Sequence, residues 1–113
     1  MEWARLNEEL LWYLYNNRTE STEWMVAAAF YSAVHLLSAY LVTKKKAAVG
    51  PHSGDRFLVE DPVLDTIALA YGKLKDYQFG ILYRLRTHTL QQISADVVPQ
   101  LEAIKKHIFT NLQ

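Results

Sequence analysis

The chain has 113 residues, is 50% apolar and carries 12 basic and 12 acidic residues, so its formal net charge is zero. This length predicts a single domain, residues 1–113, with enough material for a hydrophobic core. Cysteine does not occur, which excludes a disulfide framework and a thiolate metal site and fits a cytoplasmic protein.

The first helix is predicted over residues 2–16, where apolar side chains recur at helical spacing. The recurring residues are Trp3, Leu6, Leu10, Tyr13 and Leu14. The segment carries acidic residues early and lacks the basic and apolar regions of a signal peptide. The stretch NNRTES then interrupts the pattern and offers Thr19 or Ser21 as a cap for the next helix.

The second helix is predicted from about residue 20 to about residue 46. Its middle, AAAFYSAVHLLSAYLV at residues 27–42, is apolar nearly all round. A membrane span needs about 20 predominantly apolar residues, and two serines and a histidine at its centre would each cost free energy in lipid. Because the other predicted helices need a partner surface for their apolar stripes, we interpret this helix as the centre of a bundle and not as a membrane span.

Ser32, His35 and Ser38 step by three residues and form one loose polar strip on this helix. We expect the strip to line a contact with another subunit or to lie beneath the basic loop that follows. No metal site is expected at His35, because no histidine or acidic residue lies three or four positions away on its helix. We expect one ring nitrogen of His35 to be hydrogen-bonded inside the bundle.

Asp61 and Pro62 mark the start of the third helix, with aspartate as the cap and proline at the first helical position. Its apolar stripe comprises Leu64, Ile67, Ala68, Tyr71 and Leu74. The stretch YQFGILYRLRTH at residues 77–88 has no clear period and contains Gly80. We therefore predict that this stretch is mainly a connection.

The last helix carries apolar residues at nearly ideal helical spacing. They are Leu90, Ile93, Val97, Leu101, Ile104 and Ile108. Pro99 removes one backbone donor and crowds the carbonyl of Ala95, which predicts a kink, or a helix that starts near Ser94 or Asp96. Together with a long loop over residues 43–61, these helices predict an all-α, up-and-down bundle of four to five helices.

Charge is distributed unevenly, with a net charge of −3 over residues 1–42 and of +3 over residues 43–88. The basic residues of the second section are Lys44, Lys45, Lys46, Arg56, Lys73, Lys75, Arg84 and Arg86. They predict either a basic patch for an anionic partner or an ordinary solvated surface. We favour the solvated surface, because the total charge is not that of a strong nucleic-acid binder.

The segment WMVAAAFYSAVHLLSAYLV, the loop with GPHSGDR and the later tyrosine-rich element resemble the HEPN family (higher eukaryotes and prokaryotes nucleotide-binding). The matching residues are Trp24, Phe30, Tyr31, His35, Tyr40, His52, Arg56, Tyr71, Leu74 and Tyr83. The resemblance covers most of residues 20–90, as in small stand-alone prokaryotic members. It implies a helical bundle that usually forms a symmetric dimer through its central helices.

HEPN ribonucleases place an arginine, then a polar residue and, four to six positions on, a histidine on one helix. In this chain Arg84 and His88 are separated by three residues, and Arg86 and His88 by one. His52 and Arg56 occur in the opposite order. The chain therefore departs from the ribonuclease motif, and no catalytic residue is assigned.

Two functional hypotheses follow from the residues and the resemblance. The first is a dimeric, cytoplasmic HEPN-like interaction protein that binds RNA, nucleotide or a nucleotidyltransferase partner in a toxin–antitoxin or defence system, without cofactor or metal. The alternative is a divergent, metal-independent ribonuclease. An anionic ligand, such as RNA or a nucleotide, is expected to bind at six residues, namely His52, Arg56, Tyr83, Arg84, Arg86 and His88. The two connections that carry these residues lie at opposite ends of an up-and-down bundle, unless the loop folds back or a dimer joins them.

Overall fold

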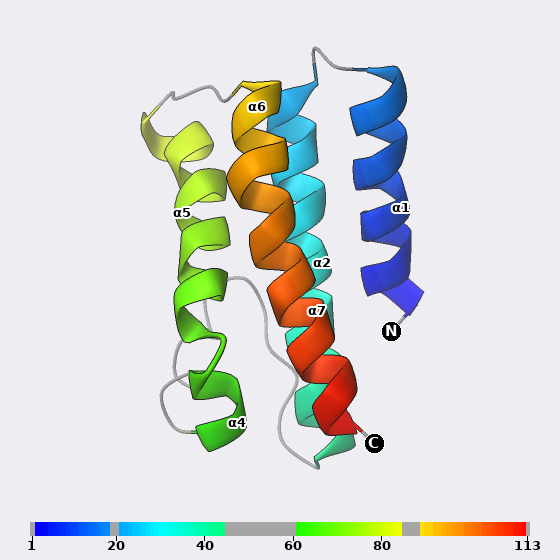
Figure 1. Ribbon diagram of the computed structural model, residues 1–113, viewed down its shortest axis with the longest axis vertical. Helices are drawn as coiled ribbons and strands as arrows, with labels where there is room; N and C mark the ends of the chain where they lie inside the picture. The colour runs from blue at the N-terminus through cyan, green and yellow to red at the C-terminus, as the bar shows by residue number, and fades with distance from the viewer. Residues whose placement is uncertain (1, 19–20, 45–60, 85–88, 113) are drawn as a thin grey trace.

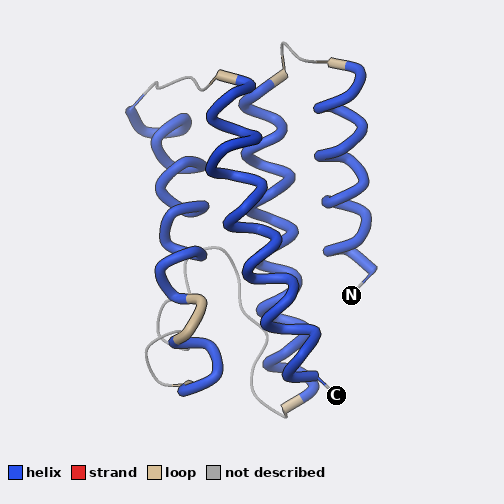
Figure 2. The backbone as a smooth tube through the Cα atoms, viewed as in Figure 1, coloured by secondary structure: helices blue, strands red, loops and turns tan. Residues whose placement is uncertain are grey.

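The described part of the chain forms helices that run alternately up and down (Figure 1). The computed structural model describes residues 2–18, 21–44, 61–84 and 89–112, and no strand occurs among them (Figure 2). In chain order the helices are α1 (Glu2–Asn17), α2 (Thr22–Thr43), α4 (Pro62–Asp65), α5 (Ala68–Arg84), α6 (Leu90–Gln92), the π-helix η1 (Ile93–Val97) and α7 (Val98–Leu112). The prediction of an all-α bundle is confirmed.

α2 is the central helix, because it packs against α1, α5, η1 and α7. Its buried residues are Met25, Val26, Ala28, Ala29, Phe30, Ser32, Ala33, Val34, Leu36, Leu37, Tyr40 and Leu41. Among the described residues, this helix alone is long and apolar enough to cross a membrane, yet 67% of its apolar window is buried within the protein. A helix that is apolar around most of its circumference is typical of a bundle core, as the sequence predicted.

The start of the third predicted helix is confirmed at Asp61. Its side chain accepts hydrogen bonds from the backbone N–H groups of Val63 at 2.8 Å and Leu64 at 3.4 Å, and so caps α4. After a turn the chain continues as α5, which runs through Gly80 to Arg84. The prediction of a connection over residues 77–88 is therefore wrong for residues 77–84. A single glycine lowers helix propensity by only about 1 kcal/mol, which packing against the core offsets.

Pro99 is accommodated by a π-helical segment. The helix begins at Leu90 behind a capping box made by Thr89 and Gln92, so neither a start near Ser94 nor one near Asp96 is correct. Proline has no N–H to donate to the carbonyl four residues before it, and its ring crowds that carbonyl. In η1 each hydrogen-bonded turn contains one residue more than in an α-helix. The N–H of Val98 accordingly donates to the carbonyl of Ile93, five residues before it.

The π-helical segment is also tied to α5 by a side-chain hydrogen bond. Asp96 in η1 accepts a hydrogen bond from the Tyr77 hydroxyl at 2.5 Å and another from the Gln100 amide at 2.9 Å. The bond from Tyr77 is the main reason that the pKa of Asp96 is lowered, and it raises the pKa of Tyr77 to about 12. This hydrogen bond is the main cause of both pKa shifts, and it fixes η1 against α5.

Candidate interaction surface

α1 packs against the bundle with the side that carries Ala4, Leu11, Leu14 and Tyr15. Ala4 and Leu11 are buried against α2, which is the main neighbour of α1. The hydroxyl of Ser32 on α2 donates a hydrogen bond of 3.0 Å to the backbone carbonyl of Ala4. The small alanine side chain lets the two helices approach closely enough for this bond, so Ser32 serves the contact between helices.

The large apolar residues of α1 lie on the surface. Trp3, Leu6, Leu10 and Tyr13 are between 39% and 66% exposed, although they form the most regular apolar stripe in the sequence of this helix. The expectation that this stripe meets the central helix is wrong for these four residues, whereas Leu14, the fifth residue of the predicted stripe, is half-buried and packs against the core. α1 has two apolar sides, and the side with Ala4, Leu11, Leu14 and Tyr15 is the one that packs against the core.

α2 continues the exposed stripe. Trp24 and Val42 are 62% and 58% exposed, and Tyr31 and His35 between them are half-buried. The rings of Trp3 and His35 lie 6.3 Å apart and join the contributions of the two helices. We define the α1–α2 face by eight residues, namely Trp3, Leu6, Leu10, Tyr13, Trp24, Tyr31, His35 and Val42.

Next to the Trp3–His35 contact the face is hollowed by a depression of about 370 Å³. It is lined by Trp3, His35, Ser38, Ala39, Val42, Thr43 and Leu112. Two members of the polar strip on α2, His35 and Ser38, therefore lie at this surface, while Ser32 is buried. Within the described residues His35 contacts Trp3 and is not hydrogen-bonded inside the bundle, so that expectation is wrong. Partial burial lowers the pKa of its ring below the usual value.

The predicted anion site falls mostly outside the described residues. His52, Arg56, Arg86 and His88 lie outside them, so their arrangement stays a prediction. Tyr83 and Arg84 are in the last turn of α5, and Figure 1 shows this turn at the end of the bundle opposite to Thr43, where α2 ends. No group of three histidine, aspartate or glutamate residues that suits a metal ion occurs in the described ranges.

No family model matches the chain, and neither the curated proteins nor the solved structures contain a match. The candidate surface therefore depends on geometry and chemistry. Its strongest feature is the exposure of three large aromatic residues, Trp3, Tyr13 and Trp24, over two neighbouring helices. Large apolar side chains that gather on the surface of a soluble protein often mark a site where a partner binds.

Proposed function

We propose that the protein is a HEPN-like helical interaction protein that forms a homodimer through the α1–α2 face. The observation that supports this most directly is the row of large apolar side chains on the outer sides of α1 and α2. The resemblance to HEPN proteins over residues 20–90 supports it independently, because that family usually pairs through its central helices.

The size of the face suits a stable dimer. Trp3, Tyr13 and Trp24 are each more than half exposed. A large aromatic side chain buries about 150–250 Å² in full, and the parts of these three that remain exposed supply a substantial share of the roughly 800 Å² that each partner contributes to a standard interface. Leu6, Leu10 and Val42 extend the same surface.

The charge of the face suits a second copy of this chain. A two-fold axis brings the same patch of both copies together, so charged groups near the axis would repel their own copies. The eight residues of the α1–α2 face carry no formal charge when His35 is neutral. A partner recognised by charge would find few complementary groups there, whereas an identical face meets no electrostatic penalty.

The resemblance further supports a role of the dimer in binding RNA or nucleotide, or a nucleotidyltransferase in a toxin–antitoxin or defence system of the cytoplasm. The basic residues for an anionic ligand are those named in the sequence, and of these Arg84 lies in the last turn of α5. The order and spacing of the arginines and histidines speak against the alternative, a metal-independent ribonuclease.

Sedimentation velocity at micromolar concentration tests the dimer. The native chain is expected to sediment with twice the mass of the 13.1 kDa chain. Leu10→Glu places a charge on both sides of the interface and is expected to give a monomer with an unchanged far-ultraviolet spectrum, because Leu10 is exposed in the single chain.

The matched control is Gln91→Glu, which makes the same change of charge at an exposed position on α6, outside the α1–α2 face. This variant should remain dimeric. A native chain that is monomeric over the whole concentration range, or a Leu10→Glu variant that still dimerises, would contradict the proposal.

A further inference from the structure

A second concave surface lies between α1, α2 and α7 and shares no residue with the α1–α2 face. It is a crevice of about 340 Å³, at the lower end of the range of roughly 300–1,000 Å³ that small-molecule sites occupy. The crevice exists because α1 packs mainly on α2, while Lys105 of α7 reaches α1 through an ion pair with Glu8.

The inner wall of the crevice is apolar. Ala4 of α1, Leu36 of α2 and Phe109 of α7 line it from three helices. Ser32 also lines it, but its hydroxyl hydrogen is used in the bond to the Ala4 carbonyl. A short aliphatic chain can therefore be buried here against carbon atoms, without leaving a polar donor of the wall unpaired.

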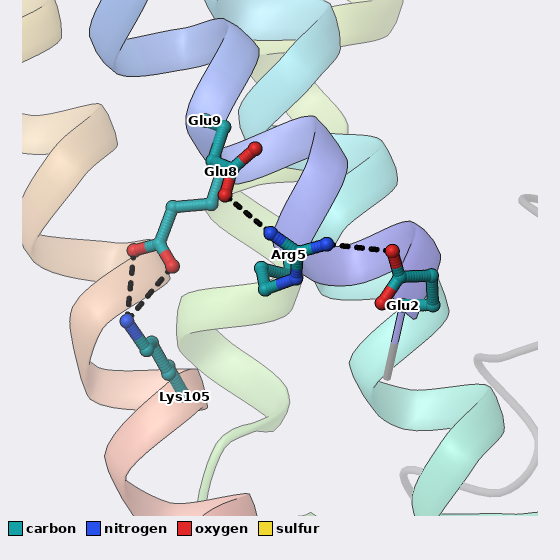
Figure 3. Close-up of polar contacts among 5 residues, drawn as sticks. All are labelled: Glu2, Arg5, Glu8, Glu9 and Lys105. Carbon is teal, nitrogen blue, oxygen red and sulfur yellow. Dashed lines mark hydrogen bonds and ion pairs between the residues drawn. The ribbon is translucent and has the colours of Figure 1, made fainter.

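The rim of the crevice carries charged groups from α1 and α7 (Figure 3). The two carboxylate oxygens of Glu8 lie 2.8 and 3.0 Å from the Lys105 ammonium. Arg5 is held by Glu2 at 2.6 Å and by Glu9 at 2.5 Å, as Figure 3 shows. Both cations of the rim are thus already paired with carboxylates.

The balance of charge at the rim is negative. Glu102 adds a further carboxylate on α7, and its pKa is raised by burial and by the nearby Glu8, against the opposing effect of Lys105. The ion pairs at the rim join three carboxylates, Glu2, Glu8 and Glu9, to two cations, Arg5 and Lys105, so the carboxylates outnumber the cations. A cationic head group would relieve this excess, whereas an anionic one would add to it.

We propose that this crevice binds small amphiphilic cations, with the aliphatic chain against Ala4, Leu36 and Phe109 and the ammonium group beside Glu8. This site goes beyond the proposed dimer and does not depend on it, because the two surfaces share no residue. Its ligand class is the primary alkylammonium ion of short chain length.

The experiment titrates the full chain with hexylammonium, hexanoate and hexanol and follows the methyl resonances of Ala4 and Leu36. Hexylammonium is expected to give saturable shifts and to bind about two- to fivefold more tightly than hexanoate, which is the range that one partly exposed ion pair supplies. Phe109→Ala should weaken all three probes, because it removes part of the apolar wall.

Glu8→Gln is the deciding variant, because it removes the carboxylate and leaves Lys105 without its Glu8 partner. It should abolish or reverse the preference for ammonium over carboxylate and leave hexanol binding unchanged. Glu23→Gln, the same change at an exposed position on α2, should keep the native preference. Methyl shifts that do not saturate, equal binding of hexanoate and hexylammonium by the native chain, or a native preference retained in Glu8→Gln would overturn the proposal.

Discussion

His35 is the one histidine in the α1–α2 face, where it lies half-buried against Trp3. Burial lowers its pKa, and the positive amino terminus acts in the same direction. Dimerisation would bury the ring further and lower its pKa again, so the dimer binds protons less readily than the separate chains. Lowering the pH through the ring's pKa therefore favours dissociation.

We accordingly expect the dissociation constant of the dimer to rise as the pH is lowered from about 7.5 to about 5.5, by up to roughly tenfold per pH unit for each proton taken up. Sedimentation at both pH values measures this. His35→Gln should remove most of the dependence, whereas His107→Gln, in which a ring outside the face is replaced, should retain it. If the pH dependence of the dissociation constant remained in His35→Gln, another titratable group would be its cause.

Phe30 shows how much a single core residue contributes. It is fully buried, and its ring lies 5.7 Å from the rings of both Tyr71 and Phe79 on α5. Phe30→Asp would place an unpaired carboxylate in the core at a cost of several kcal/mol, which is comparable with the whole stability of a small domain.

We expect Phe30→Asp to lose its helical far-ultraviolet spectrum at 25 °C. Leu69→Asp is the control, because Leu69 is exposed in the first turn of α5, where an acidic residue suits the helix dipole. A folded Phe30→Asp protein with native-like thermal unfolding would show that the core around α2 is not packed as described.

At the scale of the helices, the two prolines at helical positions offer a direct comparison. Pro99 is exposed and follows the π-helical segment, whereas Pro62 occupies the first position of α4. Proline inside a helix costs about 3 kcal/mol relative to alanine, but at the first position its missing N–H costs nothing. Pro99→Ala should therefore raise the free energy of unfolding by about 1–3 kcal/mol, as part of the proline penalty is already relieved by η1.

Denaturant unfolding measures this difference, and Pro62→Ala is the matched control for which no gain is expected. A loss of stability in Pro99→Ala would mean that the wide turn is required by the packing of Ile93 and by the Tyr77–Asp96 hydrogen bond. In that case the π-helical segment would be specified by tertiary contacts and not by the proline.

The helices themselves could be predicted wherever a local signal is unambiguous. The Asp61–Pro62 start and the buried stripe from Leu64 to Leu74 depend on capping geometry and on periodicity, which are properties of the local sequence. The end of α5 was missed because Gly80 predicts a break from the local sequence, whereas the helix continues through it to Arg84. The π-helical segment was missed because a proline predicts a disturbance without specifying its form.

The side on which α1 packs could not be predicted for a different reason. The periodicity of Trp3, Leu6, Leu10 and Tyr13 is stronger than that of the residues that meet α2, and periodicity alone does not show which neighbours a helix has. The exposed position of these four residues became visible only in the structure, and the crevice at Glu8 and Lys105 arises from helices distant in sequence.

At the scale of the whole molecule, α1 determines both candidate sites. The bundle measures 40 × 26 × 20 Å, and α1 forms one edge of it (Figure 1). One flank of α1 contributes half of the α1–α2 face, and the other flank contributes Glu8 and Arg5 to the crevice. A change that shifts α1 on α2, such as replacement of Ala4 by a larger residue, would therefore affect both surfaces together.

The central position of α2 also has a consequence for synthesis of the chain on the ribosome. α1 and α2 emerge first, while α5 and α7 are still to be made. At about 5–20 residues per second, the residues from the end of α2 to the end of α7 take several seconds to follow. Until α5 has been made, Phe30 on α2 lacks the rings of Tyr71 and Phe79 that it contacts in the folded protein. The order of the helices thus leaves the apolar surface of α2 without its partners from α5 and α7 until the rest of the chain has been synthesised.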